Sequence, residues 1–545
     1  MNLIMKSHHL GFTAKADTPI RSLAFAEALR TLMRFDEKLN AWLGPLTVIW
    51  AVEQTCINHG VGRKFCPQLL KQVMITQREG VSITTLTPLD FQPAGAKMLA
   101  LNKTYMLSDE QGLGKTIQAI MALADLGHPP VMICAPSSVK LNWRDELTLH
   151  LSDKYIITVI KNRAQFRYPT DNEIVIFNKE QLPQRTQQCT LANIRLIVDE
   201  AHELSGDADA LGVAPNGTRL RIPRTQCVNR MASLIAALRK KNGWVWFFTA
   251  TPLGNDPSRL RNLLRLLGVF DMLFENDEEY EYMFRARHER LEIKDKRTNV
   301  IRRVIKTHWG TPREELAPIL KRVIFRREKC DVLASLPSKR LQKVSIELCT
   351  DVSSLHNQAV RVIAERNRDL LDWRHWVSLS ETPRFEEVSR ALNALASAKV
   401  KALLEWAKLY EDAGEAVIVM SAHRVCVEVF AGREGWGVIH GGIPRAKRQD
   451  IVNALRNKRL KGVACTIRAA GVGLTLTAAA HMLVPSVDWN PALNAQMIDR
   501  IHRYTQTRKV LIRFLTSNTK LEELQWKVLE HKLLSNQITS MLAVR

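Results

Sequence analysis

A glycine-rich turn between an apolar run and an amphipathic run constrains this chain more than any other feature. Residues 109–116 read DEQGLGKT, after an expected strand at 104–108 and before an expected helix at 116–125. Glycines let the backbone curl and direct its amides inward, and a helix starting near Lys115 adds its positive end. Asp109 occupies the first glycine position of the strict pattern G-x-x-x-x-G-K-[ST]. The turn predicts a phosphate-binding loop; a glycine-rich turn without a ligand is the alternative.

Paired carboxylates follow a second apolar run. Residues 199–202 read DEAH, directly after IRLIV at 194–198. A nucleoside triphosphate with its magnesium needs a lysine for the phosphate oxygens and carboxylates for the metal and the attacking water. We therefore expect Lys115 to contact the phosphates, and Thr116 and Asp199 to hold the metal. Glu200 is expected to orient the water, and His202 to couple the site to the rest of the domain. An ordinary acidic turn is the alternative.

Strands and helices alternate twice along the chain. The first region has expected strands at 104–108, 131–135, 173–177, 195–198 and 244–249. The second has expected strands at 416–420, 462–466, 481–485 and 510–515, with helices at 399–411 and 445–455. Such alternation predicts an α/β fold with two parallel, doubly wound sheets, whose ligands bind at the carboxyl ends of the strands. Residues 1–80 are expected to be helical, with an amphipathic run at 22–35.

The charge of the chain favours a polyanionic partner. The 545 residues carry a net charge of +23 and a pI of about 9.8, which favours nucleic acid over a surface kept basic for solubility. Residues 285–343 alone hold 18 Lys and Arg against 7 Asp and Glu, and are expected to form basic helices.

The cysteines predict neither a disulfide framework nor a zinc site. They number nine and include no C-x-x-C pair, which suits a reducing cytoplasm. Cys56, His59 and Cys66 lie close in sequence but lack a fourth ligand. No signal-peptide pattern opens the chain, and the apolar stretch 41–52 is shorter than the roughly 20 residues of a membrane helix.

Further candidate residues follow other expected strands. The sequence TATP at 249–252 ends an apolar strand, where Thr249 could sense the nucleotide. A glycine-rich turn within TIRAAGVGLTLT at 466–477 is followed by QMIDRIHR at 496–503. Arg500 and Arg503 are expected one helical turn apart on one face, where they suit the charge of a transferring phosphoryl group. A helix-surface pair near Asp499 is the alternative.

Taken together, these motifs resemble those of the SWI/SNF-type superfamily II helicase-like ATPases. DEQGLGKTIQ, DEAH, TATP, SAHR at 421–424, TIRAAGVGLTLT, DWNP at 488–491 and QMIDRIHRYTQT stand in that family's order. FRREKCDVLASLPSK at 325–339 resembles the signature that separates this family from general DExH helicases. The resemblance covers about residues 87–529 and is nearest the SMARCAL-type annealing-helicase branch. Thr505 and Ala250 depart from the family's glycines.

The resemblance implies two tandem RecA-like lobes with helical insertions, and hydrolysis of ATP with Mg²⁺ coupled to stepping along double-stranded or branched DNA. The implied parts are an N-terminal helical extension at 1–80, lobe 1 at 81–265, helical insertions at 266–395, lobe 2 at 396–525 and a C-terminal helix at 526–545. The expected catalytic residues are Lys115, Asp199, Glu200, Arg500 and Arg503. The expected nucleotide contacts are Gln92, Asp109, Glu110, Gln111, Gly112, Leu113, Gly114, Lys115, Thr116, Gly473, Gln496, Arg500 and Arg503. The expected DNA contacts are Pro136, Ser137, Asn142, Trp143, Ser421, Arg424 and Thr475.

Two rival functions remain open from the sequence: an RNA-directed DExH helicase and a catalytically silent, ATP-binding DNA clamp. The compact build suggests a bacterial or phage source and a cytoplasmic, nucleoid-associated location, or a nuclear one in a eukaryote. The sequence does not choose among replication, repair, recombination and defence.

Overall fold

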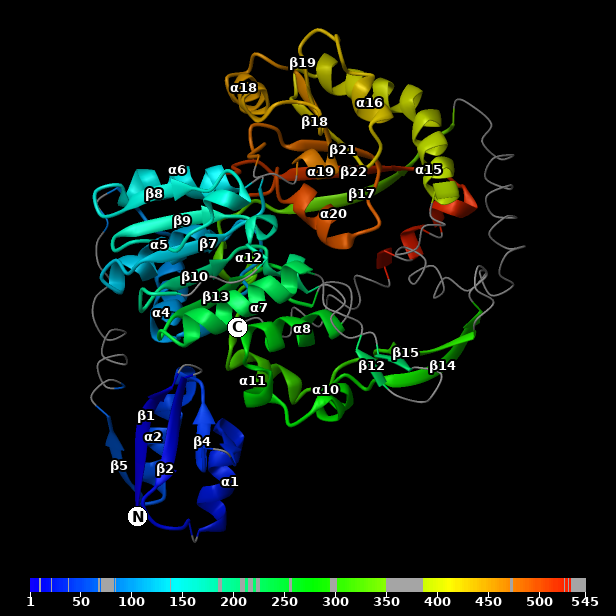
Figure 1. The fold of residues 1–545 in the computed structure, drawn as a ribbon. Helices are drawn as coiled ribbons and strands as arrows, with labels where there is room; N and C mark the ends of the chain where they lie inside the picture. Colours follow the sequence, from blue (N-terminus) through cyan, green and yellow to red (C-terminus); the bar gives the residue numbers. More distant parts are fainter. Residues whose placement is uncertain are drawn as a thin grey trace. The chain divides into compact units, whose positions relative to one another are not determined.

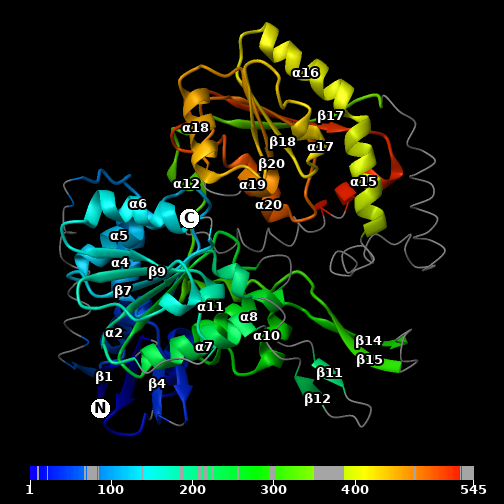
Figure 2. The same cartoon turned by 45° about the horizontal axis from the view of Figure 1, so that its top comes forward.

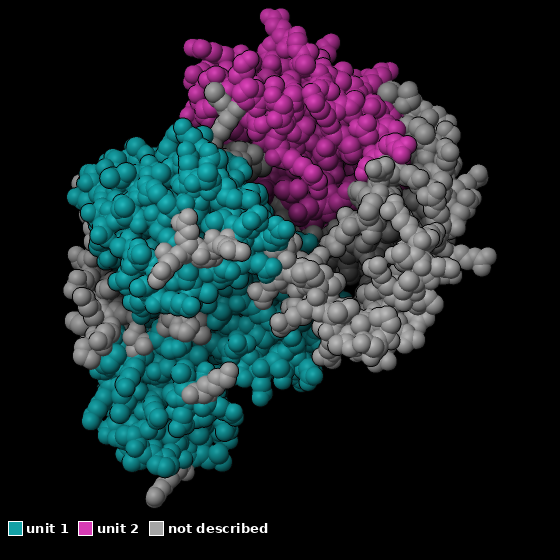
Figure 3. Space-filling view, viewed as in Figure 1, with its two compact units in different colours: residues 1–332, 536–545 teal, residues 333–535 magenta. Residues whose placement is uncertain are grey.

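The chain divides into two compact units, Met1–Val332 and Leu333–Ser535, coloured separately in Figure 3. The computed structural model describes residues 1–8, 11–20, 22–37, 39–66, 69, 83, 85–137, 139–184, 189–205, 211–213, 219–221, 226–253, 257–294, 301–348, 386–470, 474–523, 525–527 and 529–530. None of the helices in these ranges is long and apolar enough to cross a membrane.

The first part of unit 1 is a small mixed sheet, so the expected helical character of residues 1–80 is wrong. Its strand order is β3-β4-β2-β1-β5. The strands are β1 (Asn2–His8), β2 (Gly11–Ala16), β3 (Arg34–Asp36), β4 (Ala41–Gly44) and β5 (Gly62–Phe65), with helices α1 (Leu23–Leu32) and α2 (Ile49–Asn58) (Figure 1). Alternate residues of the first hairpin are buried, Leu3 and Met5 in β1 and Phe12 and Ala14 in β2, which is the period of a strand.

A seven-stranded, all-parallel sheet forms the centre of unit 1, in the order β16-β6-β13-β10-β7-β9-β8. Its strands are β6 (Thr104–Leu107), β7 (Val131–Cys134), β8 (Ile156–Val159), β9 (Glu173–Phe177), β10 (Arg195–Val198), β13 (Trp244–Phe248) and β16 (Ile324–Phe325). Helices flank it, among them α4 (Gln92–Leu101), α5 (Lys115–Asp125), α6 (Lys140–Leu151), α7 (Gln226–Arg239), α8 (Pro257–Leu267) and α11 (Leu316–Lys321) (Figure 2).

Strand β13 explains why these apolar runs become central strands. Val245 and Phe247 pack into the core cluster on one face, whereas Trp246 and Phe248 pack into the cluster on the other. A strand covered on both faces by helices needs an uninterrupted apolar run, and β13 reads WVWFF. The five strands that the sequence predicts here are confirmed. β8 and the edge strand β16 were not predicted.

Unit 2 contains a second all-parallel sheet, in the order β17-β22-β21-β18-β20-β19. The strands are β17 (Lys339–Ser345), β18 (Val417–Ser421), β19 (Trp436–Ile439), β20 (Gly462–Thr466), β21 (His481–Ser486) and β22 (Val510–Thr516). Helices include α15 (Glu386–Ala398), α16 (Val400–Asp412), α18 (Arg445–Arg456) and α20 (Pro491–Ile498). The predicted α/β class with two parallel sheets is therefore confirmed.

The segment 266–395 is less helical than expected. Short helices α9 (Phe270–Leu273) and α10 (Asp277–Met283) come first, but β14 (Arg287–Lys294) and β15 (Ile301–His308) then form an antiparallel hairpin. With β11 (Leu211–Val213) and β12 (Arg219–Arg221) they build a four-stranded sheet. The expectation of basic helices fails here because these residues pair in an antiparallel ladder that runs from Arg287 opposite His308 to Lys294 opposite Ile301. Residues 349–385 of the predicted insertion, and most of the C-terminal helix predicted at 526–545, lie outside the described residues.

Candidate functional site

The glycine-rich turn connects β6 to α5 at the carboxyl end of the seven-stranded sheet. Gly112 and Gly114 adopt positive φ values of 88° and 75°, a left-handed conformation that favours glycine. Gly114 directly precedes α5, so the unpaired amides at the helix start face the turn. Lys115 Nζ donates to the carbonyl of Asp109 at 2.8 Å, which holds the ammonium group over the loop.

Gln92 is buried against this turn. Its Oε1 accepts from the Leu89 amide at 2.9 Å, and its Nε2 donates to the Leu113 carbonyl at 3.2 Å. A Cβ at Gly114 would lie 2.4 Å from Gln92 Nε2, so the glycine is required for this close approach. The Gln92 side chain thus supports the loop by bonding to the main chain of Leu89 and Leu113.

The side chains of Asp109 and Glu110 contact the segment 327–329, which the sequence analysis did not predict to lie beside the phosphate loop. Asp109 accepts from Arg327, through the backbone amide at 3.0 Å and the guanidinium Nε at 3.2 Å, and from Gln118 Nε2 at 3.0 Å. Glu110 accepts from the Lys329 amide at 2.7 Å. Because both carboxylates are engaged by this segment, we expect Asp109 and Glu110 to contact a nucleotide through their main-chain atoms.

Arg326 joins the phosphate-loop strand to the strand of the TATP sequence. Its Nη1 donates to the carbonyls of Ser108 at 3.0 Å and Ala250 at 2.9 Å. Ser108 Oγ in turn donates to the Thr249 carbonyl at 2.8 Å. Burial lowers the pKa of Arg326 from its ordinary value. The sequence FRREK at 325–329 contains all three of these contacting residues, Arg326, Arg327 and Lys329. Its resemblance to a family signature is the feature of the sequence that could have indicated a role for them.

The DEAH turn follows β10, two strands away from β6 in the same sheet. Asp199 Oδ2 accepts from Trp143 Nε1 at 2.8 Å, and Asp199 Oδ1 accepts from the Glu200 amide at 2.9 Å. Burial, together with the neighbouring Glu200 carboxylate, raises the pKa of Asp199 to about 6. Glu200 adopts a φ of 48°, a strained left-handed conformation for a residue with a side chain.

His202 links the DEAH turn to the TATP sequence through side-chain contacts. Its Nδ1 lies 3.2 Å from Thr249 Oγ1 and 3.3 Å from Glu200 Oε2. Burial alone would lower the pKa of His202, but the hydrogen bond and charge of Glu200 outweigh burial and raise it. A change at Glu200 can therefore reach Thr249 through one side chain.

A cavity of about 310 Å³ opens beside the DEAH turn. It is lined by residues at the ends of β7 and β10 and in the segments that follow β7, β9 and β10, namely Cys134, Ala135, Pro136, Ser137, Lys179, Glu180, Val198, Asp199, Glu200, Glu203 and Leu204. Two expected DNA contacts, Pro136 and Ser137, therefore line the same cavity as two expected catalytic carboxylates.

Trp143 is misplaced as an expected DNA contact. It is 1% exposed and stacks against Phe248, and its indole N–H is used by Asp199. Trp143 lies on the face of α6 that packs into the core, so DNA cannot reach its ring. Ser137 is exposed and accepts from Asn178 Nδ2 at 2.9 Å, whereas Asn142 is half-buried on α6.

The expected arginine pair of unit 2 lies after helix α20, not on it. The helix ends at Ile498, and the Arg500 carbonyl accepts from the Leu476 amide at 2.9 Å, which draws the chain away from the helical pattern. Arg500 is buried, and Arg503 Nη1 donates to Thr475 Oγ1 at 2.7 Å. Burial lowers the pKa of Arg503. The hydroxyl of Thr475, an expected DNA contact, is thus engaged by Arg503.

The remaining site residues expected in unit 2 differ in their exposure to solvent. Ser421 is fully buried, and its Oγ donates to the His423 carbonyl at 2.9 Å, so it is not a surface contact. Arg424 is exposed and pairs with Glu428 at 2.6 Å. Gln496 is half-buried on α20. Gly473 lies outside the described residues.

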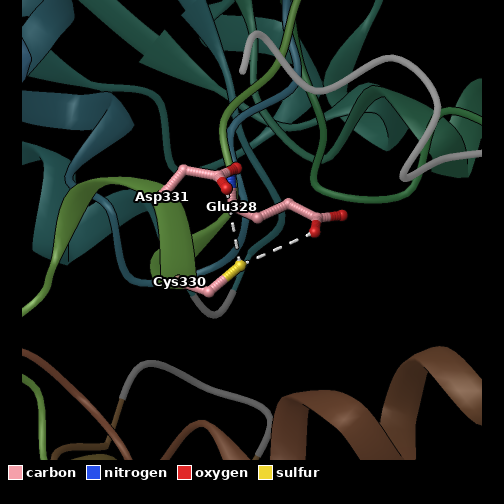
Figure 4. A group of neighbouring side chains, drawn as sticks. All are labelled: Glu328, Cys330 and Asp331. Atoms are coloured by element: carbon pink, nitrogen blue, oxygen red, sulfur yellow. Dashed lines mark hydrogen bonds between the residues drawn. The ribbon is translucent and has the colours of Figure 1, made fainter.

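Metal-binding side chains gather at one place in the described part of the chain. Glu328, Cys330 and Asp331 offer three ligand atoms, with Cys330 Sγ 3.9 Å from Glu328 Oε2 and 3.7 Å from Asp331 Oδ1 (Figure 4). Partial burial and the two carboxylates raise the pKa of this thiol, which keeps it protonated and a poor ligand. We assign no metal there. Cys56 is buried, and Cys66 Sγ accepts from the Leu69 amide.

Comparison with known proteins yields two family models. The model described as SNF2-related domain matches residues 30–212, and the helicase conserved C-terminal domain matches residues 398–505. The first match begins within the N-terminal mixed sheet and ends after the DEAH turn. The second covers most of the unit 2 sheet.

Curated relatives match across most of the chain. The DNA annealing helicase and endonuclease ZRANB3 of Mus musculus is 26% identical over 78% of this chain and 38% of its own length. The human ZRANB3 is 26% identical over 82% of this chain and 39% of its own. The SMARCA-like protein 1 homolog of Caenorhabditis elegans is 26% identical over 86% of this chain and 62% of its own. The chain thus spans about two fifths of the ZRANB3 relatives.

A solved structure, the Sulfolobus solfataricus SWI2/SNF2 ATPase core in complex with dsDNA, also matches. The match has a TM-score of 0.37 and 19% identity, and it covers 86% of this chain and 99% of that one.

Proposed function

We propose that this chain, which belongs to the SWI/SNF-type superfamily II helicase-like ATPases near the ZRANB3 and SMARCAL branch, hydrolyses ATP and couples hydrolysis to movement along double-stranded DNA. One observation carries the proposal. The phosphate loop follows β6 and the DEAH turn follows β10, so both lie at the carboxyl edge of one parallel sheet with only β13 between their strands. A lysine and two carboxylates converging at such an edge suit a triphosphate and its metal.

The geometry of the loop fits a bound ATP. The left-handed glycines and the start of α5 present main-chain amides, and Lys115 Nζ already lies over the turn, where phosphate oxygens would replace the Asp109 carbonyl as its acceptor. Gln92 would contact the adenine edge, because a carboxamide has two donor hydrogens and two acceptor lone pairs and so can bond to a base as well as to Leu89 and Leu113.

Thr116 and Asp199 would hold Mg²⁺, which neutralises phosphate charge when bound. Glu200 would orient the attacking water and accept its proton. The strained backbone of Glu200 and its contact with His202 fix the direction of that carboxylate. His202 would then pass the state of the site to Thr249.

Unit 2 would supply the charge that stabilises the transferring phosphoryl group. Arg500 and Arg503 are the proposed donors, with Gly473 and Gln496 as further nucleotide contacts. Arginines in this role can contribute roughly 10³–10⁵ in rate. Thr475 Oγ1 accepts from the Arg503 guanidinium and thereby limits the freedom of that side chain.

Duplex DNA is the proposed track. The net charge of +23 favours a polyanion, and relatives are named DNA annealing helicases, which supports rewinding of complementary strands at branched DNA as the finer activity. Pro136, Ser137, Asn142 and Arg424 remain the proposed backbone contacts, and such contacts carry no sequence information. A DNA partner places the chain at a nucleoid or in a nucleus.

ATP turnover with different polymers tests the proposal. We expect duplex and branched DNA to stimulate turnover strongly, with little effect of double-stranded RNA. Stimulation by RNA alone would instead support an RNA-directed helicase. ATP binding without turnover on any polymer would support a silent clamp.

A further inference from the structure

Two distant segments of unit 1 build a small sheet that includes none of the ATP-site motifs. β11 and β12 follow the DEAH turn in sequence, whereas β14 and β15 form a hairpin about 80 residues later; the order is β12-β11-β15-β14. Figures 1 and 2 both draw this sheet next to α10. We call it the basic sheet.

The basic sheet carries a large positive excess. Its four strands contain eight Lys and Arg against two Glu. The strand register places only Arg303 and Lys306 opposite an acid, Glu292 and Glu289 respectively. The other six cationic positions face neutral residues or a histidine across the ladder, Arg219, Arg221, Arg287, Arg290, Lys294 and Arg302. The backbone register thus sets few of these cationic positions directly opposite an acid.

The described end of the hairpin is open to solvent. Arg287, His288 and Glu289 are exposed. Glu289 Oε2 lies 2.7 Å from His308 Nε2, so one of the two acids is already engaged within the sheet. A strong excess of cationic positions on one small sheet favours a polyanionic partner.

A chain of contacts connects the basic sheet to the DEAH turn. The carbonyl of Ser205, just after that turn, accepts from Asn262 Nδ2 at 3.3 Å on α8. The next residue toward the start of α8, Arg261, pairs with Glu281 at 3.2 Å. Glu281 also contacts His288 Nε2 at 2.9 Å, on β14. α8 and α10 thus attach the hairpin to the part of the lobe that holds Asp199 and Glu200.

We propose that the basic sheet is a second nucleic-acid contact of unit 1 that binds the phosphate backbone of duplex DNA. This inference rests on the proposed DNA dependence and adds a site outside the helicase motifs. The spread of cations along two eight-residue strands suits a row of phosphates more than a single small anion.

Duplex-DNA affinity measured across a salt series tests the inference. In the triple variant Arg290→Gln, Lys294→Gln and Arg302→Gln, we expect about tenfold weaker binding at moderate salt. The log–log salt slope should fall by about two to three, because each lost phosphate contact removes about 0.9. The matched control replaces three exposed cations of the same unit by glutamine, Arg144, Lys154 and Lys161, and should keep the slope of the parent.

A second variant, which should tighten DNA binding rather than weaken it, distinguishes lost phosphate contacts from misfolding. Glu289→Gln with Glu292→Gln raises the positive charge of the same strands and should tighten DNA binding. Basal ATP turnover without DNA reports on folding and should be unchanged in every variant. Parental affinity and slope in both the triple and the double variant would overturn the inference, even if the parent is stimulated by DNA. A parent without DNA stimulation would instead count against the proposed function.

Discussion

Arg327 and Asp109 lie 218 residues apart in the chain and form a buried ion pair at the first position of the phosphate loop. Their side chains are 6% and 0% exposed. The first glycine position of the loop pattern is thus filled by a carboxylate that a distant arginine holds in place. Gln118 donates to the same carboxylate from α5, so the pair joins both ends of the turn.

Replacement of Arg327 by methionine should destabilise unit 1 and weaken ATP binding. Asp109 would be left buried without its partner, and breaking a buried pair costs roughly 3–5 kcal/mol. Urea unfolding and ATP titration measure the two effects. The control is Arg144→Met, which breaks the exposed pair with Asp145 and should cost under about 1 kcal/mol. Equal losses in the two variants would contradict a special role for Arg327.

Removal of the contact between His202 and Thr249 should reduce the stimulation of ATP hydrolysis by DNA. We expect His202→Ala and Thr249→Val to bind ATP normally but to lose most of the DNA stimulation of turnover. The double variant should be no worse than either single one, because both remove the same contact. Additive losses in this double-mutant cycle would show that the two residues act separately.

Trp143→Phe separates a support role from a DNA-binding role. Phenylalanine keeps an aromatic ring in the core but removes the N–H that donates to Asp199. We expect slower ATP turnover with unchanged affinity for duplex DNA. Weaker DNA binding with parental basal turnover would restore Trp143 as a DNA contact.

Lys399 should be a main stabilising residue of unit 2. Its buried ammonium donates to Glu522 at 2.6 Å and to the carbonyls of Pro485 and Leu515. Lys399→Met should lower the free energy of unfolding by roughly 3–5 kcal/mol, because Glu522 stays buried without a cation. Adding Glu522→Gln should recover part of the loss. The exposed control Lys401→Met should change stability little, and a similar loss there would contradict the account.

The central strands could be predicted because burial on both faces leaves a continuous apolar run in the sequence, as in β13. The sites at their carboxyl ends followed from that topology. The N-terminal sheet was missed because its short strands alternate and α1 lies between them, so an amphipathic helix dominated the reading. The hairpin of β14 and β15 was missed because its apolar and charged residues follow no regular two-residue period, as IRRVIKTH in β15 shows.

Side-chain partners from distant segments were beyond sequence reasoning. Trp143 reads as a surface aromatic near a turn, and only the packing of α6 shows that it is buried against Phe248. Arg327 reads as one basic residue among many, and its pairing depends on the edge strand β16 joining β6. Both cases turn on which segment lies beside which strand.

Single-turnover hydrolysis by the parent and by Glu200→Gln, with saturating ATP and with or without duplex DNA, tests the central claim most directly. Glutamine keeps the shape of the side chain but cannot accept the proton of the attacking water. We predict that DNA accelerates the parent, whereas Glu200→Gln binds ATP and DNA but hydrolyses ~10²–10⁴-fold more slowly. A parent indifferent to DNA, or a variant with more than about half the parental rate, would contradict the account.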